Sequence, residues 1–181
     1  GVRNTSITVG GGNEKTSYNA TFSGTNEEGF IPGNELKKRN LGLGINSELS
    51  KKFSMQTSFN FASTEVDSPP ISAGLGSGSV SSAVSIFGDV LYTPRSIDLM
   101  GLPFEAPDGR SVYYRSGNDI QNPRWTAKYS AQTDDVKRFQ GSNLFVFKAN
   151  DKLNFSYRTG LDTYSGTQEY IVNRGGPNIP I

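Results

Sequence analysis

Hydrophobic and polar residues alternate along most of the chain, which is the pattern of β-strands with one apolar and one polar face. The alternation is clearest in Lys38–Leu49, where apolar side chains at positions 41, 43, 45 and 49 share one face. Similar patterns predict six strands, over Thr5–Gly10, Thr16–Gly24, Lys38–Leu49, Phe53–Phe61, Arg138–Lys148 and Leu153–Tyr164. Only Leu144 and Val146 blur the alternation in the fifth. The sequence therefore predicts an all-β protein.

The second face of these strands consists of Asn, Ser, Thr, Gln and Gly and carries little charge. A soluble β-sandwich would turn its apolar face inward and a charged face outward. A transmembrane β-barrel turns its apolar face to lipid and its polar face to the interior, with strands of roughly 10 residues. The pattern favours antiparallel transmembrane β-barrel strands over a sandwich. The residues then expected to face lipid are Leu41, Leu43, Ile45, Phe59, Phe61, Phe145, Phe147, Phe155 and Leu161.

The connections between the predicted strands differ in length from one end of the sheet to the other. Short turns fall at one end, over residues 11–15, 50–52 and 149–152. Long connections fall at the other end, over residues 25–36, 68–133 and beyond 165. Outer-membrane barrels have short periplasmic turns and long extracellular loops, and the smallest single-chain barrels have eight strands. We therefore expect residues 1–181 to be part of a larger barrel domain; the N-terminal Gly1-Val2-Arg3, which is no signal peptide, agrees with an internal or processed chain.

Residues 68–133 break the strand pattern and are expected to form a long extracellular loop between two strands. Within them, near-helical spacing of apolar residues, including Phe87 and Leu91, predicts a short helix over Ser79–Tyr92. Ser79 or Ser81 would cap its N-terminus, although Gly88 and the β-branched valines oppose a helix. Loops of this length are usually functional or disordered.

Three aromatic residues of this loop are candidate ligand contacts: Tyr113, Tyr114 and Trp125. Exposed aromatic faces would stack on sugar rings or pack against a capping lipoprotein. The favoured alternative is packing within the loop itself, because large aromatic side chains in long loops generally anchor them. Three basic residues, Lys38, Arg39 and Arg158, would line a lumen, pair with carboxylates of a plug or lie at the membrane interface.

Composition excludes several classes of function. Among the 181 residues, 18 are Lys or Arg and 17 are Asp or Glu, so the net charge of +1 provides no basic surface for nucleic acid. Cysteine and histidine are both absent, which removes thiolate nucleophiles, zinc-thiolate sites and the commonest general base. We expect no catalytic residues, no metal and no cofactor, and therefore no enzyme.

Several segments resemble, in order and spacing, the barrel of SusC/RagA-type TonB-dependent transporters of Bacteroidota. They are Ser6–Ala20, Glu28–Pro32, Lys38–Leu41, Leu49–Phe53, Pro94–Asp98, Asn122–Trp125, Arg138–Gly141, Asn150–Leu153 and Arg158–Tyr164. The resemblance implies a large outer-membrane barrel that imports bulky nutrients, such as glycans or peptides. It also implies a plug domain and a TonB-contacting segment that lie outside these residues, and a SusD-like surface lipoprotein as partner. Two alternatives stay open: a secreted or surface carbohydrate-binding or adhesion β-domain, and an outer-membrane barrel without TonB coupling.

Overall fold

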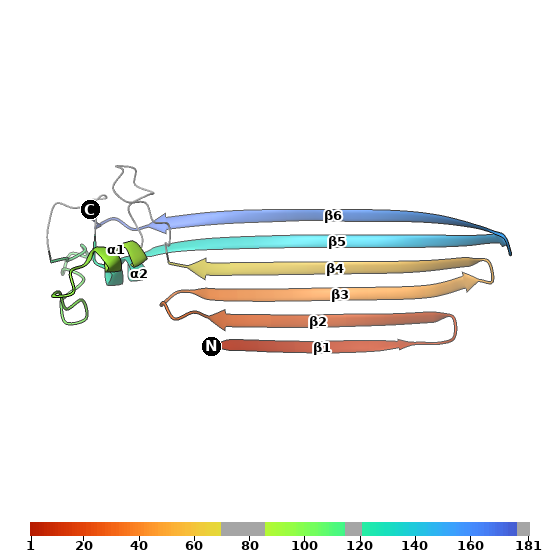
Figure 1. Ribbon diagram of the computed structural model, residues 1–181, viewed down its shortest axis with the longest axis horizontal. Helices are drawn as coiled ribbons and strands as arrows, with labels where there is room; N and C mark the ends of the chain where they lie inside the picture. Colours follow the sequence, from red (N-terminus) through yellow and green to blue (C-terminus); the bar gives the residue numbers. More distant parts are fainter. Residues whose placement is uncertain (70–85, 115–120, 177–181) are drawn as a thin grey trace. The chain divides into compact units, whose positions relative to one another are not determined.

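The computed structural model describes residues 1–69, 86–114 and 121–176. It contains six antiparallel strands in one sheet, in the order β1-β2-β3-β4-β5-β6 (Figure 1). Their bounds are Val2–Gly12 (β1), Thr16–Glu28 (β2), Glu35–Ser50 (β3), Phe53–Ser68 (β4), Ser130–Asn150 (β5) and Leu153–Val172 (β6). Two short helices lie between β4 and β5: α1, Ile86–Tyr92, and α2, Pro123–Tyr129. The all-β prediction is confirmed, and the sheet is open, with β1 and β6 at its edges.

The chain divides into two compact units, which we describe separately. The strand unit consists of Gly1–Glu28, Leu36–Glu65 and Asp134–Thr167. The loop unit consists of Gly29–Glu35, Val66–Thr133 and Gln168–Ile181.

The strands extend beyond their predicted limits. Strand β5 begins at Ser130 rather than at Arg138, and β6 ends at Val172 rather than at Tyr164. Residues near these ends, such as Gln132, Thr133 and Thr167, are polar, so the alternation of apolar and polar residues fades there. Backbone hydrogen bonds do not depend on side-chain polarity, and the strands therefore continue where the sequence pattern stops.

Cross-strand side-chain bonds identify the residues that share the polar face. Hydroxyl groups pair between Thr8 and Thr21 at 3.1 Å and between Ser58 and Ser142 at 2.8 Å. The Asn40 amide donates to the Ser23 hydroxyl at 3.4 Å, which connects β3 to β2. Successive side chains of a strand point to opposite faces, so the residues next to these bonded positions lie on the other face of the sheet.

The opposite face of the strand unit is apolar. The register of β1 and β2 places Ile7 beside Phe22 and Val9 beside Ala20 on this side. The nine residues predicted to share an apolar face lie in the other strands. Each is an odd number of positions from a polar-face residue of its own strand, which is Asn40, Ser58, Ser142 or Asp162. All nine therefore lie on this apolar face. We use the name apolar band for the alternate side chains on this face within Leu41–Leu49, Phe53–Phe61, Phe139–Phe147 and Leu153–Leu161.

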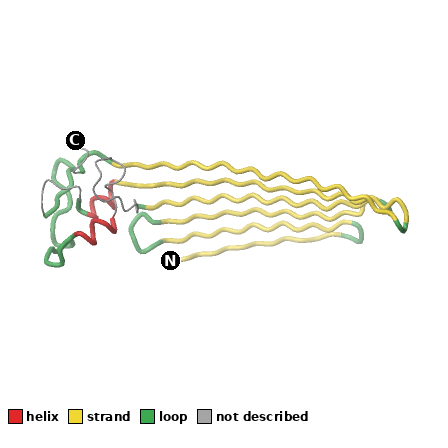
Figure 2. Tube along the Cα trace, turned by 45° about the horizontal axis from the view of Figure 1, so that its top comes forward, coloured by secondary structure: helices red, strands yellow, loops and turns green. Residues whose placement is uncertain are grey.

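The strand unit is a single layer without a hydrophobic core (Figure 2). In the described part of the chain, the only buried large hydrophobic residues are Ile86 and Trp125, and both belong to the loop unit. By contrast, the exposed fraction is 39% for Leu43, 37% for Phe59 and 58% for Phe155. The apolar side chains of the strand unit are therefore not covered by a second layer within that unit.

The loop unit contains one helix that was predicted and one that was not. Helix α1 lies within the predicted Ser79–Tyr92 range, and the proposed caps Ser79 and Ser81 lie outside the described residues. Helix α2 was missed, although Asn122 and Pro123 are typical first residues of a helix. The Asn122 side chain accepts a hydrogen bond from the Arg124 amide at 3.0 Å, which satisfies a free N–H group of the first turn. Among the described residues, no helix has the length and hydrophobicity to cross a membrane.

Candidate functional surfaces

The apolar band has a uniform height across four strands. It consists of alternate residues within Leu41–Leu49, Phe53–Phe61, Phe139–Phe147 and Leu153–Leu161. Each range spans eight residue steps, which is about 27 Å along a strand at about 3.4 Å per residue. A strand tilted by about 40° would therefore raise the band by about 21 Å before side-chain length is added, close to the roughly 25 Å apolar height of outer-membrane barrels.

No charged side chain interrupts the apolar band. The four ranges contain two charged residues, Glu48 and Arg158, and both occupy positions that point to the polar face. Aromatic contacts connect neighbouring strands within the band, with ring centroids of Phe53 and Phe145 6.1 Å apart. A second ring contact joins Phe59 and Phe139 at 6.0 Å. Between the two ring pairs, the Thr57 hydroxyl donates to the Asn143 side chain at 2.8 Å. The surface of β4 and β5 is therefore mostly apolar and contains one uncharged, mutually hydrogen-bonded polar pair.

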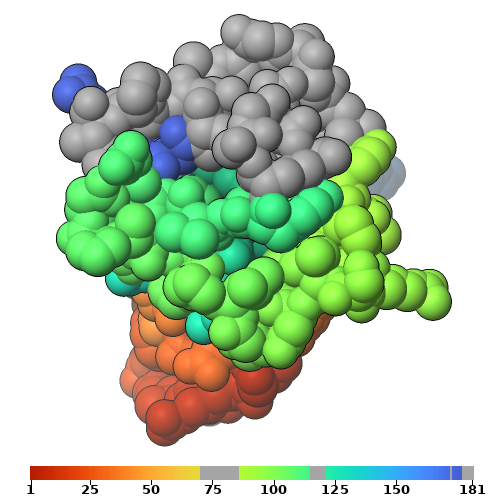
Figure 3. Space-filling model, turned by 90° about the vertical axis from the view of Figure 1, so that its left-hand side faces the viewer, coloured from red at the N-terminus to blue at the C-terminus, as the bar shows by residue number. Residues whose placement is uncertain are grey.

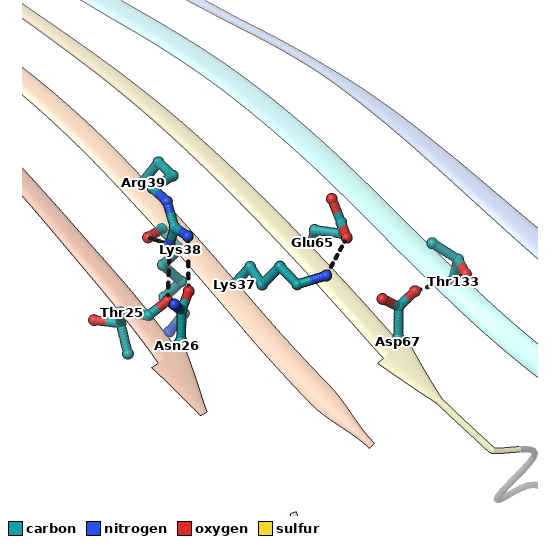
Figure 4. Close-up of polar contacts among 8 residues, drawn as sticks. All are labelled: Thr25, Asn26, Lys37, Lys38, Arg39, Glu65, Asp67 and Thr133. Atoms are coloured by element: carbon teal, nitrogen blue, oxygen red, sulfur yellow. Dashed lines mark hydrogen bonds and ion pairs between the residues drawn. The ribbon is translucent and has the colours of Figure 1, made fainter. Parts of the chain in front are cut away.

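Charged residues border the band on the same face, at the end of the strands that leads to the long connections (Figure 4). The Lys37 ammonium lies 3.0 Å from the Glu65 carboxylate. Arg39 donates to the Thr25 carbonyl at 3.1 Å and to the Asn26 side chain at 2.7 Å. Lys and Arg commonly lay their apolar stems along a hydrophobic surface and keep the charge in water.

The other end of the band is also bordered by charge. The β3–β4 turn carries Lys51 and Lys52, and the β5–β6 turn carries Asp151 and Lys152. All four residues are exposed. The band is therefore an apolar strip of defined height between two charged margins.

The polar face carries a shallow groove of about 480 Å³ on β4, β5 and β6. Its polar lining is Ser58, Asn60, Gln140, Ser142 and Asp162. Arg138 holds the Asp162 carboxylate with two bonds, Nε to Oδ1 at 2.9 Å and Nη2 to Oδ2 at 2.5 Å. Gln140 donates a third bond to Oδ2 at 3.1 Å. The Asp162 charge is therefore compensated within the sheet.

A second groove of about 370 Å³ lies beside the first on the polar face and shares Ser58 and Ser142 with it. Arg158 lies in this second groove. The hydrogen-bonding side chains of the two grooves are hydroxyls, amides, the Asp162 carboxylate and the Arg158 guanidinium. Lys38 and Arg39 were predicted, like Arg158, to line a lumen, to pair with carboxylates of a plug or to lie at the membrane interface. Lys38 is exposed on β3, and Arg39 lies on the opposite face at the margin of the band.

The predicted aromatic residues of the loop are not grouped into one exposed surface. Trp125 is fully buried in the loop unit, and its indole N–H donates to the Gly109 carbonyl at 3.0 Å. Tyr113 and Tyr114 are half-buried, with ring centroids 4.5 Å apart. Figure 3 shows the surface of residues 86–114, in yellow-green to green. The faces of the Trp125 ring are thus not exposed to a ligand.

A surface cluster in the loop unit was not predicted. Glu105 accepts hydrogen bonds from Lys128 at 2.6 Å and from the Tyr129 hydroxyl. These two bonds, that from Lys128 first, lower the pKa of Glu105 below its usual range. The Arg124 guanidinium lies 4.5 Å from the centre of the Phe104 ring. These contacts connect α2 to the segment around residue 105.

Helix α1 is oriented opposite to its predicted apolar face. Phe87 is 44% and Leu91 is 82% exposed, whereas Asp89 is only 4% exposed. Burial raises the pKa of Asp89 to about 7, although hydrogen bonds from the Gln121 backbone and the Thr126 hydroxyl oppose the shift. These bonds from Gln121, two residues before α2, and from Thr126 within α2 hold the polar side of α1 inward. Sequence periodicity could not indicate this arrangement, because the partners lie more than 30 residues away.

No group of three or more acidic side chains in the described ranges is arranged to hold a metal ion. A comparison with protein-family models found no match to the chain, and a comparison with curated protein sequences found no match either. What the chain does is therefore inferred from its own residues.

Proposed function

We propose that this chain forms part of the wall of an outer-membrane β-barrel that imports bulky nutrients, such as glycans or peptides. The single observation that carries the proposal is the apolar band: an uncharged apolar strip with charged margins at both ends, opposite a polar face with grooves lined by hydroxyl and amide groups. A bilayer requires this combination, because strand residues alternate between lipid and the barrel interior.

The energetics of the apolar band support a lipid environment. Covering a large apolar side chain stabilises a protein by about 1.5–3 kcal/mol, and exposed apolar patches larger than a few hundred Å² usually mark an interaction surface. A soluble adhesion or carbohydrate-binding sandwich would cover the band with a second sheet. Its other face would be charged and turned to solvent. In the four ranges that carry the band, the polar face has only two charged residues, Glu48 and Arg158, so a membrane barrel has the stronger support.

The remaining parts of the proposal have a different basis. Energy supply through TonB, a plug in the barrel and a SusD-like lipoprotein as partner are inferred from the resemblance of the ordered segments to SusC/RagA-type transporters. A barrel without TonB coupling would have the same two-faced strands. A plug and a TonB-contacting segment upstream in the complete reading frame would distinguish the two.

Paired arginine substitutions on the two faces test the proposal. Counting along the antiparallel strands from the Lys37–Glu65 pair places Leu43 beside Phe59, and Asn60 is the next residue on the polar face. Leu43→Arg should destabilise the folded barrel by about 2–4 kcal/mol, because the charge would enter lipid near mid-membrane. Asn60→Arg, at nearly the same height, should cost less than about 1 kcal/mol, because its charge stays in the polar interior.

The measurement is urea unfolding of the protein expressed from the complete reading frame and folded into phospholipid vesicles. Folding is followed by heat-modifiable gel migration. We expect the folded-to-unfolded ratio to fall roughly 30- to 700-fold for Leu43→Arg alone, since 1.4 kcal/mol corresponds to a factor of ten. Equal effects of the two substitutions, or a larger effect of Asn60→Arg, would refute the assignment of the faces.

A further inference from the structure

The two arginines on the polar face of β5 and β6 differ in their partners. Arg138 makes a two-pronged ion pair with Asp162. Arg158 is exposed on β6, four residues before Asp162, and forms no hydrogen bond or ion pair with residues 1–69, 86–114 or 121–176. Two guanidinium groups on the same face are thus in different states, one neutralised and one unpaired.

The groove around Arg158 offers hydrogen-bond donors and no acidic residue. It is lined by the side chains of Asn46, Gln56, Ser58 and Ser142, which supply amide and hydroxyl groups. Leu144 also lines it and gives an apolar surface for the stem of Arg158. The volume of about 370 Å³ is sufficient for a monosaccharide-sized ligand.

The carboxylates on the polar face are not positioned to neutralise Arg158. Asp162 already receives bonds from Arg138 and Gln140. Glu48 is on β3, three strands away from β6, which is about 14 Å at a strand spacing of about 4.8 Å. Glu48 also lines a different groove, near the β1–β2 turn. The positive charge of Arg158 is therefore uncompensated among the described residues.

We propose that the Arg158 groove binds a carboxylate group of a ligand. The planar guanidinium donates two parallel hydrogen bonds to a carboxylate, a geometry that neither lysine nor a neutral amide reproduces. Asn46, Gln56 and the two serines then donate to, or accept from, hydroxyl groups next to the carboxylate. The inference rests on the proposed function, because it takes the polar face to be the interior wall along which ligands pass.

A matched pair of sugars tests the proposal on the protein expressed from the complete reading frame, purified in a polyoxyethylene detergent. Galacturonate and galactose differ in a single carboxylate, and the detergent contains neither sugar nor carboxylate. Binding is followed by ligand-observed NMR titration. We expect saturable galacturonate binding on the order of 1 mM, and galactose binding at least about tenfold weaker, because one charged hydrogen-bonded contact contributes that much. Salt should weaken galacturonate binding by screening the charge.

Three variants assign the effect to Arg158. R158Q should bind galacturonate no better than galactose. R158K should bind galacturonate with intermediate affinity, because lysine keeps the positive charge but cannot donate two parallel hydrogen bonds to a carboxylate. R39Q removes the same charge from the opposite face and should bind like the unmodified protein. Acetate separates the ligand sources: affinity equal to that of galacturonate indicates any carboxylate, including a protein side chain, and weaker affinity indicates a sugar acid.

The proposal is overturned if the unmodified protein shows no preference for galacturonate, if R158Q keeps the preference, or if R39Q loses it as well. Heat-modifiable migration of each variant verifies that the barrel is folded. Failure of the binding test leaves the paired Leu43 and Asn60 result unchanged, whereas an equal cost of those two arginines would refute the barrel assignment itself.

Discussion

The buried Asp89 carboxyl should make the stability of the loop unit depend on pH. Its pKa is raised from 3.8 to about 7 in the folded state. Between these values the folded state binds a proton that the unfolded chain has lost, so the free energy of unfolding falls as pH rises. The stabilisation is fully present below pH 3.8, the pKa of Asp89 in the unfolded chain, and it is lost as the pH rises through about 7, the pKa of Asp89 in the folded protein.

The size of the effect follows from the shift. One pKa unit corresponds to 1.36 kcal/mol, so a change from 3.8 to about 7 amounts to roughly 4 kcal/mol over the whole range. From pH 5 to pH 8 the expected loss is about 3 kcal/mol. This window avoids the opposite effect of Glu105, whose lowered pKa makes its contribution disappear only in more acidic solution.

Asp89→Asn keeps the shape of the side chain and removes the ionisation. The variant should show no fall in stability between pH 5 and pH 8, and at pH 8 it should be more stable than the unmodified protein by about 2–3 kcal/mol. The difference is smaller than the full shift because the amide loses one acceptor atom for the Gln121 and Thr126 donors, which costs about 1 kcal/mol.

Hydrogen–deuterium exchange of the α2 amides, corrected for the intrinsic pH dependence of exchange, measures this opening of the loop unit without unfolding the strands. Thr126→Val supplies a second variant: loss of the hydroxyl donor should extend the fall in stability to higher pH. An identical pH dependence in the Asp89→Asn variant and the unmodified protein would contradict the assignment, as would a less stable variant at pH 8.

Two further substitutions examine how the loop unit is held together. Trp125→Phe removes the indole donor of the Gly109 carbonyl and part of a fully buried side chain, and should cost about 1–3 kcal/mol, measured as faster exchange of α2 amides. Asn122→Ala removes the N-cap of α2 and the bond from its amide to the Val112 carbonyl, and should cost about 0.5–2 kcal/mol in the same measurement. Unchanged exchange in either variant would show that the contact contributes little.

Much of the strand unit could be predicted because its signal is local. The alternation at Leu41, Leu43 and Ile45 depends only on successive side chains pointing to opposite faces, and short turns join neighbouring strands. The outer ends of β5 and β6 could not be predicted, because both faces are polar there and backbone hydrogen bonds alone continue the ladder. Helix α2 could have been found from Asn122 and Pro123, which begin it.

The sequence by itself determined which side chains share a face and where charge borders the apolar strip, because a period of two is a property of each extended strand. Only the tertiary structure decided the partners across strands and loops. Strand register pairs Arg138 with Asp162 and leaves Arg158 unpaired in the described residues. Contacts from α2 bury Asp89 and leave Leu91 exposed, against the apolar periodicity of α1. These outcomes depend on residues that are distant along the chain, and local pattern contains no information about which of them meet.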